Sequence, residues 1–435
     1  MNTHTYTLEL AGKTMTAQFT DLTDQANGSV LLTYGETTIL VTVVMSDRTS
    51  NMSYFPLSVE FEEKFYAAGQ ILGSRFMRRE GRPSDEAVLT ARIIDRTLRP
   101  LFDQRLRYDI QVVANVLAMG EDDPDVLGVI GASLALSVSD IPWGGPVGAA
   151  RIAMTADGGV YGINPTYTDR LDAAVSGEVL ACGKDGLINM IETGGKEVKE
   201  ASIITALETS SAIHQQLETW QTTIIKEQGK AKRVIEFPVV PRAVRDLYEA
   251  EYRDRFYQTI FSDQPGKQHI TELKAAFLED VATRELPADT ATVEHYIEEQ
   301  IDSTLHDGAC KNSKRADGRG FSDIRPLYAQ AGGLSPVLHG SGIFYRGGTH
   351  IFSALTLGGP DEAQLVDTIE LQDTKKRFLH HYNFPPFSVG ETGRVGGFNR
   401  RMIGHGALAE KALAPVIPPQ STFPYTIRLV SETLA

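Results

Sequence analysis

Two stretches of the sequence, residues 28–44 and 340–355, repeat one layout of glycines and β-branched residues at a constant offset of 312 positions. Each stretch is typical of two β-strands joined by a turn, which falls at Gly35 in the first and at Gly347 in the second. The matching positions are Gly28 and Gly340, Ser29 and Ser341, Gly35 and Gly347, Thr37 and Thr349, and Ile39 and Ile351. The repeat restricts the chain to folds that contain two similar β-rich parts.

Further matches follow downstream in the same order. The segment YFPLSVE at 54–60 is echoed by NFPPFSV at 383–389, and TLRPLF at 97–102 has a weaker counterpart in ALAPVI at 412–417. A pair of adjacent arginines also follows in each copy, Arg78–Arg79 in the first and Arg400–Arg401 in the second. From this order we infer an internal duplication, and we expect the two arginine pairs to be equivalent.

The sequence between the copies differs from them in periodicity and composition. Residues 197–305 show helical periodicity and many acidic residues, and glycine is nearly absent from 230 to 307. Residues 307–320 are rich in Gly, Asp and Lys, which is typical of a linker. The sequence therefore predicts an α+β protein with an all-helical insert of about a hundred residues.

Charge is unevenly distributed along this acidic chain. The formal net charge is −14, yet residues 74–107 hold nine arginines against five acidic residues, and residues 375–405 hold six basic residues against one. Basic patches on an acidic body are typical of a focused polyanion site, whereas two solvated basic surfaces explain the charge alone more simply. The apolar run at 127–139 is too short to span a bilayer, so we expect no membrane segment. Two widely spaced cysteines fit a reducing compartment.

Residues 83–100, PSDEAVLTARIIDRTLRP, carry the start and stop signals of a helix. Ser84 can serve as the N-cap, because its hydroxyl can accept a hydrogen bond from a free backbone N–H of the first turn. Asp85 and Glu86 follow at the positive end of the helix dipole, and Pro100 closes the segment.

Three arginines share one side of this predicted helix. At about 100° per residue, Arg92, Arg96 and Arg99 fall within about 60° of one another. The opposite side carries Ala87, Ala91, Ile94 and Leu98. Because like charges one turn apart repel, we expect an anionic neighbour, either a phosphate group or the helix's own Asp95 and Glu86. Both interpretations stay open at this point.

The loop SRFMRREGRP, residues 74–83, places Arg78 and Arg79 beside Phe76 and between glycines. Such a loop suits the backbone of a nucleic acid, because guanidinium groups bind phosphate bidentately and a neighbouring ring can stack on a base. Core packing of Phe76 is the alternative. No Walker loop, HExxH, paired CxxC or GxSxG motif is present, and the spacing of residues assembles neither a nucleophile with a base nor a metal site.

Four longer segments resemble bacterial polynucleotide phosphorylase, a family of polyribonucleotide nucleotidyltransferases. They lie at 65–102, 131–152, 317–327 and 381–413. The resemblance implies two RNase PH-like domains, the second incomplete, separated by an all-helical domain. We expect boundaries at 1–206, 207–306 and 307–435.

The resemblance also implies an activity. Members of this family degrade RNA processively from the 3′ end, as inorganic phosphate attacks the terminal phosphodiester and a nucleoside diphosphate leaves. The family implies Mg²⁺ as cofactor, a homotrimeric ring around single-stranded RNA, a cytoplasmic role in mRNA turnover and a possible RNA-degradation complex. A noncatalytic RNA-binding ring scaffold is the alternative.

Specific positions match the family's RNA- or phosphate-binding residues. They are Phe76, Arg78, Arg79, Arg92, Arg96, Arg99, Arg400, Arg401 and His405, the last lying near the active site of the second domain. Met77 replaces a second aromatic of the loop, and Gly348 replaces a glutamate.

The catalytic centre is expected elsewhere. The family's phosphate-binding serines, its catalytic aspartates with a lysine, and so its metal ligands correspond to positions beyond Ala435. In the first copy Asp172 aligns with a catalytic aspartate, but Ala174 stands at the lysine position. Because the chain stops within a strand-like run, we expect a truncated fragment that guides RNA and is inactive alone.

Overall fold

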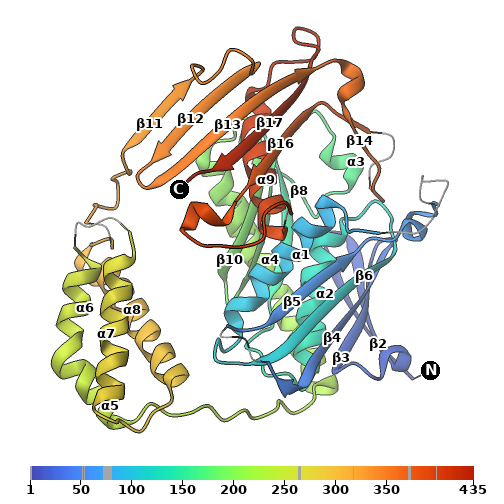
Figure 1. Ribbon diagram of the computed structural model, residues 1–435. Coiled ribbons are helices and arrows are strands. Elements are labelled where there is room, and N and C mark those ends of the chain that lie inside the picture. The colour runs from blue at the N-terminus through green and yellow to red at the C-terminus, as the bar shows by residue number, and fades with distance from the viewer. Residues whose placement is uncertain are drawn as a thin grey trace. The chain divides into compact units, whose positions relative to one another are not determined.

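The computed structural model describes residues 2–50, 52, 54–71, 81–262, 266–316, 318–370, 374–397 and 399–435. The chain divides into two compact units. Unit 1 comprises Met1–Val234, Ala354–Phe384 and Arg394–Ser431, and unit 2 comprises Ile235–Ser353, Pro385–Gly393 and Glu432–Ala435. Helices and mixed sheets occur together, which confirms the α+β prediction (Figure 1).

The first copy is built on a six-stranded sheet with the order β1-β2-β3-β4-β6-β5. Its strands are β1 (Thr3–Leu10), β2 (Lys13–Thr20), β3 (Gly28–Tyr34), β4 (Thr37–Thr49), β5 (Leu57–Glu62) and β6 (Tyr108–Ala118). Neighbours are antiparallel, except that β5 runs parallel to β6. The predicted turn joins β3 to β4, and Gly35 has a φ of 58°, a left-handed conformation that glycine adopts without strain.

Two helices cover this sheet. Helix α2 (Pro124–Val138) packs on β3 and β4 and is buried on nearly all sides, so the apolar run at 127–139 is a core helix. Helix α1 (Asp85–Leu98) packs on β5 and begins where the sequence predicts, because the Ser84 hydroxyl accepts a 2.9 Å hydrogen bond from the Ala87 N–H. Its predicted apolar side is buried.

A second sheet of unit 1 has the order β10-β9-β7-β8. Its strands are β7 (Gly148–Thr155), β8 (Val160–Ile163), β9 (Val175–Lys184) and β10 (Leu187–Gly195), and α3 (Tyr167–Arg170) precedes β9. Helix α4 (Glu200–Gln228) packs on β7 and β9. The predicted boundary between residues 206 and 207 falls inside α4, which belongs to unit 1, and the three-domain division stays a prediction.

The second copy contains a five-stranded sheet with the order β11-β12-β13-β17-β16. Its strands are β11 (Leu327–Ala331), β12 (Gly340–Arg346), β13 (Thr349–Gly358), β16 (Phe378–Asn383) and β17 (Thr426–Thr433). A small hairpin, β14 (Gln364–Val366) and β15 (Thr374–Lys376), precedes β16, and α9 (Arg400–Leu413) packs on β16.

Residues that are 312 positions apart in the sequence form equivalent strand pairs in the two copies. Thr16 pairs with Thr33 in the first copy, and Tyr328 pairs with Tyr345 in the second. Helices α1 and α9 both have 14 residues and begin after side-chain caps, Ser84 and Asn399. Arg400 and Arg401 therefore occupy the positions of Asp85 and Glu86 in α1. The expectation that they are equivalent to Arg78 and Arg79 is wrong, because those residues precede the first helix instead of beginning it.

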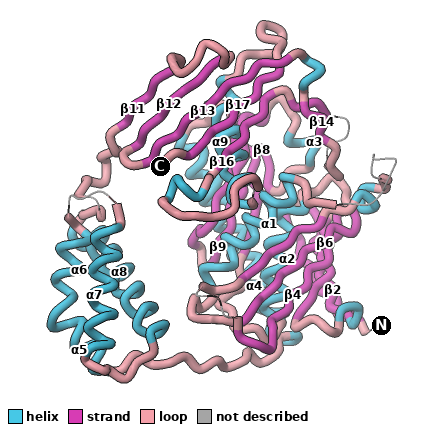
Figure 2. Tube along the Cα trace, in the orientation of Figure 1, coloured by secondary structure: helices cyan, strands magenta, loops and turns pink. Residues whose placement is uncertain are grey.

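Unit 2 contains a helical bundle, drawn as the cyan coils α5 to α8 in Figure 2. Its helices are α5 (Arg242–Leu247), α6 (Arg253–Ile260), α7 (Gln268–Thr283) and α8 (Thr290–Asn312). Its core is aromatic, with Tyr248, Tyr252, Phe256, Phe277 and Tyr296 packed together. None of the helices within the described ranges is long and apolar enough to cross a bilayer.

Candidate nucleic-acid interface

Helices α1 and α9, the equivalent helices of the two copies, pack against each other within unit 1. Their contact depends on Gly404, because a Cβ atom at that position would lie 2.3 Å from Nε of Arg92. Glycine thus leaves room for the Arg92 side chain to cross α9. This contact brings arginines of the two copies together, although they lie more than 300 positions apart in the sequence.

Four of the predicted residues gather around this contact: Arg92 and Arg96 from α1, and Arg401 and His405 from α9. We call them the cationic cluster. Burial lowers the pKa of the Arg92 guanidinium, and the charge of Arg96 lowers it further. Asp95 opposes this effect, and Arg401 adds to it. In the described part of the chain, neither Arg92 nor Arg96 has a hydrogen bond or an ion pair with a carboxylate. Among the described residues, the cluster therefore presents like charges without an ion-pair partner for Arg92 or Arg96.

Aromatic rings support the α9 side of the cluster. The Arg401 guanidinium lies 4.8 Å from the centre of the Phe384 ring, a cation–π contact. The imidazole of His405 stacks on Tyr382, with ring centres 4.8 Å apart and planes 21° apart. Burial, followed by Arg401 and Arg92, lowers the pKa of His405 below its usual value, so this ring is mostly uncharged at neutral pH.

Arg99 and Arg400 make different contacts from the cluster. Arg99 forms a 2.7 Å ion pair with Asp95 and donates to the backbone carbonyls of Phe55 and Leu57, at 3.2 and 3.0 Å. Arg400 donates to the Val59 carbonyl at 2.6 Å and pairs with Glu60. Both guanidinium groups thus attach their helices to β5 or to the segment before it.

Three predicted contact residues, Phe76, Arg78 and Arg79, lie outside the described residues together with Met77, so their roles stay predictions. Gly348 lies in the turn between β12 and β13, and a Cβ atom there would meet nothing within 4 Å. The turn therefore leaves open space for a Cβ atom at this position.

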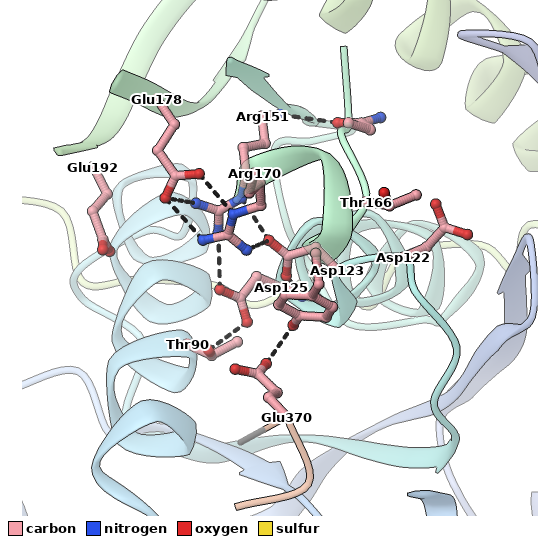
Figure 3. A network of polar contacts seen from close by, with 12 residues as sticks. Thr90, Asp122, Asp123, Asp125, Arg151, Thr166, Arg170, Glu178, Glu192 and Glu370 are labelled. Atoms are coloured by element: carbon pink, nitrogen blue, oxygen red, sulfur yellow. Dashed lines mark hydrogen bonds and ion pairs between the residues drawn. The ribbon is translucent and has the colours of Figure 1, made fainter. Parts of the chain in front are cut away.

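A second charged group, not predicted from the sequence, lies in the core of unit 1 (Figure 3). Arg151 on β7 is nearly fully buried and forms ion pairs with Asp123 at 2.5 Å, Glu178 at 3.1 Å and Asp125 at 3.2 Å. Arg170 on α3 also pairs with Asp123 and Glu178, at 3.3 and 2.8 Å. Carboxylates engage both guanidinium groups, which are therefore not available to bind a phosphate.

Three carboxylates face the two guanidinium groups in this network. Glu370 enters from the second copy as a fourth and accepts a hydrogen bond from the Tyr167 hydroxyl. Burial, followed by the neighbouring Asp123, raises the pKa of Asp125 well above its usual value. Burial also raises the pKa of Glu370 to about 7, and the charges of Asp123, Glu63 and Glu86 add to this effect. An arginine within the apolar run GAARIA was the one sequence signal for this network.

Asp172, the position aligned with a catalytic aspartate, is engaged locally. Its carboxylate accepts a 2.8 Å hydrogen bond from the Ala174 N–H and a 3.1 Å bond from the Tyr161 hydroxyl. Within the described ranges, no group of three or more His, Cys, Asp or Glu side chains is placed to bind a metal ion. The residues at hand therefore do not fit a Mg²⁺ site, and we assign no step to that ion.

The chain is similar to known ribonucleases and nucleotidyltransferases. A family model described as "3′ exoribonuclease family, domain 1", the RNase PH model, matches residues 11–142 and 323–435. Polyribonucleotide nucleotidyltransferases from Exiguobacterium sibiricum and Bacillus subtilis are 40% and 39% identical over 435 and 438 residues. Each match covers 99% of this chain but 58% and 61% of the relative. The chain thus spans about three fifths of the length of these relatives.

The match to one solved structure is weaker. Rice Rrp46 aligns with a TM-score of 0.39 and 14% identity, over 52% of this chain and 94% of the rice protein. This likeness is too low to support a conclusion. The family match, in contrast, covers both copies of the duplication and leaves the helical segment between them, which confirms the predicted RNase PH-like fold.

Proposed function

The chain belongs to the 3′ exoribonuclease family, and we propose that it binds single-stranded RNA through the cationic cluster on α1 and α9. The observation that carries this proposal is that Arg92, Arg96 and Arg401 converge within an acidic chain without a carboxylate partner among the described residues. Like charges one helical turn apart repel, so their convergence favours an anionic ligand. Phosphate groups suit the planar guanidinium fork.

For the whole protein we propose phosphorolysis of RNA, a nucleotidyl transfer to inorganic phosphate. Inorganic phosphate attacks the 3′-terminal phosphodiester of RNA, the bond to the terminal nucleotide breaks, and that nucleotide leaves as a nucleoside diphosphate. Repeated steps shorten the strand from its 3′ end and contribute to mRNA turnover. Mg²⁺, a homotrimeric ring, a cytoplasmic location and an RNA-degradation complex belong to the same proposal.

Within that reaction, the residues described here would bind and orient the strand. Arg92, Arg96 and Arg401 would neutralise backbone phosphates, which positions RNA without reading its sequence. The stacked His405 ring would donate or accept one hydrogen bond at the same place, because its lowered pKa leaves the neutral form dominant at pH 7. We propose the predicted Phe76, Arg78 and Arg79 as further contacts.

We also propose that these 435 residues alone bind RNA without degrading it. Support comes from the first copy, where Asp172 is engaged by Tyr161 and by the backbone, and Ala174 takes the lysine position. The buried arginines nearby are neutralised by carboxylates, which leaves no free anion site in that network.

One experiment tests the proposal. The chain is incubated with oligoadenylate and Mg²⁺, with and without inorganic phosphate, and binding and products are measured together. We expect binding without nucleoside diphosphates from these residues, and phosphate-dependent nucleoside diphosphates once the remaining two fifths typical of the relatives are present. Nucleoside monophosphates formed without phosphate would indicate hydrolysis and contradict the proposed reaction. Binding without products from both proteins would support the RNA-binding scaffold instead.

A further inference from the structure

A row of three rings crosses strands β11, β12 and β13, which lie side by side in Figure 2. Tyr328 and Tyr345 are directly paired across β11 and β12, with ring centres 5.6 Å apart. The imidazole of His350 on β13 lies 4.0 Å from the Tyr345 ring, with planes 30° apart. The tyrosines are 51% and 39% exposed, so the row forms a surface and not a core.

The first copy provides an internal comparison for this row. At the offset of 312, the three positions are Thr16, Thr33 and Thr38, and they pair in the same register. There the hydroxyls of Thr33 and Thr38 form a 3.0 Å hydrogen bond. The same backbone arrangement therefore needs no aromatic residue at these positions.

Other positions of these strands change less uniformly between the copies, since Leu32 corresponds to Phe344, Tyr34 to Arg346 and Leu40 to Phe352. In the neighbouring row, Gln18 and Leu31 of the first copy correspond to Gln330 and Ile343 of the second, and both pairs keep the same register. Polar and aliphatic character is thus retained at these two positions. Exchange of three paired threonines for three rings in contact, two of them exposed tyrosines, indicates a ligand contact specific to the second copy.

The charge of the sequence segment that contains the row favours a polyanion. Strands β11, β12 and β13 contain no acidic residue, and residues 311–350 carry six Lys or Arg against two Asp in a chain of net charge −14. Arg325 lies beside the turn between β12 and β13, since a Cβ atom at Gly347 would be 3.0 Å from its Cδ. Rings flanked by cations are the features on which single-stranded nucleic acids stack.

We infer that Tyr328, Tyr345 and His350 form a platform on which the bases of single-stranded RNA stack. The inference rests on the proposed function for the identity of the ligand, but it uses none of the residues of the cationic cluster. Stacking tolerates any base, so the platform would add affinity without sequence preference.

The test measures the affinity of the whole chain for fluorescein-labelled oligoadenylate. The variant Tyr328→Thr/Tyr345→Thr restores the residues of the first copy, which forms the same strand pairs with them. Each stacked ring contributes roughly a fivefold or larger factor in affinity, so we expect a loss of more than tenfold. The slope of affinity against salt should not change, because stacking displaces no counterion.

Two further variants sharpen the test. Leu327→Thr removes a side chain that is 55% exposed on the opposite side of β11, and it should change affinity less than twofold. Tyr345→Phe keeps the ring and should retain affinity. A double threonine variant with unchanged affinity would overturn the inference, and a change in self-association in its place would identify a protein interface.

The result also separates this inference from the proposed function. If Arg92→Ala/Arg401→Ala weakens binding while Tyr328→Thr/Tyr345→Thr does not, the cationic cluster stands and the platform is rejected. If the unmodified chain does not bind oligoadenylate at all, both are rejected.

Discussion

At the residue scale, neighbouring side chains of the same type perform different tasks. Arg400 and Arg401 are consecutive in α9, but Arg400 pairs with Glu60 and the Val59 carbonyl, whereas Arg401 lies over the Phe384 ring. Position on the helix decides the difference, because consecutive residues point about 100° apart. The first arginine attaches α9 to β5, and the second stays available to a ligand.

This difference predicts separate effects of two substitutions. Arg400→Ala removes a charged hydrogen bond to a backbone carbonyl and a partly exposed ion pair, so it should lower the free energy of unfolding by about 1 kcal/mol. Arg401→Ala should change it by less than about 0.5 kcal/mol but weaken RNA binding. Urea denaturation and oligoadenylate titration measure the two effects. Equal stability losses in both variants would contradict the assignment.

A buried histidine makes stability depend on pH. His214 of α4 is fully buried, its Nε2 lies 2.9 Å from the Ala181 carbonyl oxygen, and burial lowers its pKa to about 4. The unfolded chain takes up a proton near pH 6.5, while the folded chain resists until about pH 4, so stability falls as the pH falls between these values. Between pH 7 and pH 5 the histidine should cost about 2 kcal/mol of unfolding free energy. His214→Gln should remove that pH dependence of the unfolding free energy, measured by urea denaturation. The same dependence in the variant and the unmodified chain would contradict the prediction.

At the element scale, the crossing of α1 and α9 brings the two copies together. Gly404 permits the crossing of Arg92, and Lys411 near the end of α9 pairs with Glu192 of β10. Arg400 fixes the other end of α9 to β5. Three contacts spread along one helix therefore set the position of Arg401 and His405.

Substitution of Gly404, where Arg92 crosses α9, should weaken RNA binding and leave the stability of the fold nearly unchanged. Gly404→Ala places a Cβ atom against Arg92, which must move, while alanine itself favours a helix by about 1 kcal/mol over glycine. We expect a severalfold loss of RNA affinity with little loss of stability. Gly397→Ala, where a Cβ atom would meet nothing within 4 Å, is the matched control. Equal affinities of the two variants would exclude the arrangement of Arg92 as a cause.

The hairpin of β14 and β15 should respond to pH through Glu370. Its raised pKa of about 7 means that the protonated acid is the stable form in the fold, so its contribution is fully present below the unfolded value near pH 4.5 and is lost as the pH rises through 7. Glu370→Gln keeps an acceptor for the Tyr167 hydroxyl without the charge. The stability advantage of the variant over the unmodified chain should grow between about pH 4.5 and pH 7 and then level off, and a constant difference across this range would refute the assignment.

The sequence predicts individual helices and turns, but not the distant residues and strands that they contact. Helix α1 follows from the Ser84 cap and the apolar side of its sequence, and the turns at Gly35 and Gly347 follow from the repeat. The partners of Arg400 lie about 340 positions away, which no local pattern contains. Helix α4 has the same periodicity as the bundle helices, so the sequence could not show that it packs on β7 and β9.

At the scale of the whole molecule, an acidic chain concentrates basic side chains at a few places. Its net charge is −14, and the cationic cluster and the ring row both lie in locally basic segments. General repulsion of polyanions by the body and attraction at these places would confine RNA to them. We therefore expect RNA to contact the protein through its phosphates at the cationic cluster.

The most direct measurement is the dependence of oligoadenylate affinity on salt concentration. Each phosphate contact on a single strand contributes about 0.7 to the slope of log affinity against log salt, so Arg92→Ala/Arg401→Ala should reduce the slope by about 1.4. Arg242→Ala/Arg253→Ala removes the same charge from the helical bundle, where both arginines pair with carboxylates, and should leave the slope unchanged. Equal slopes in all three proteins would contradict the account.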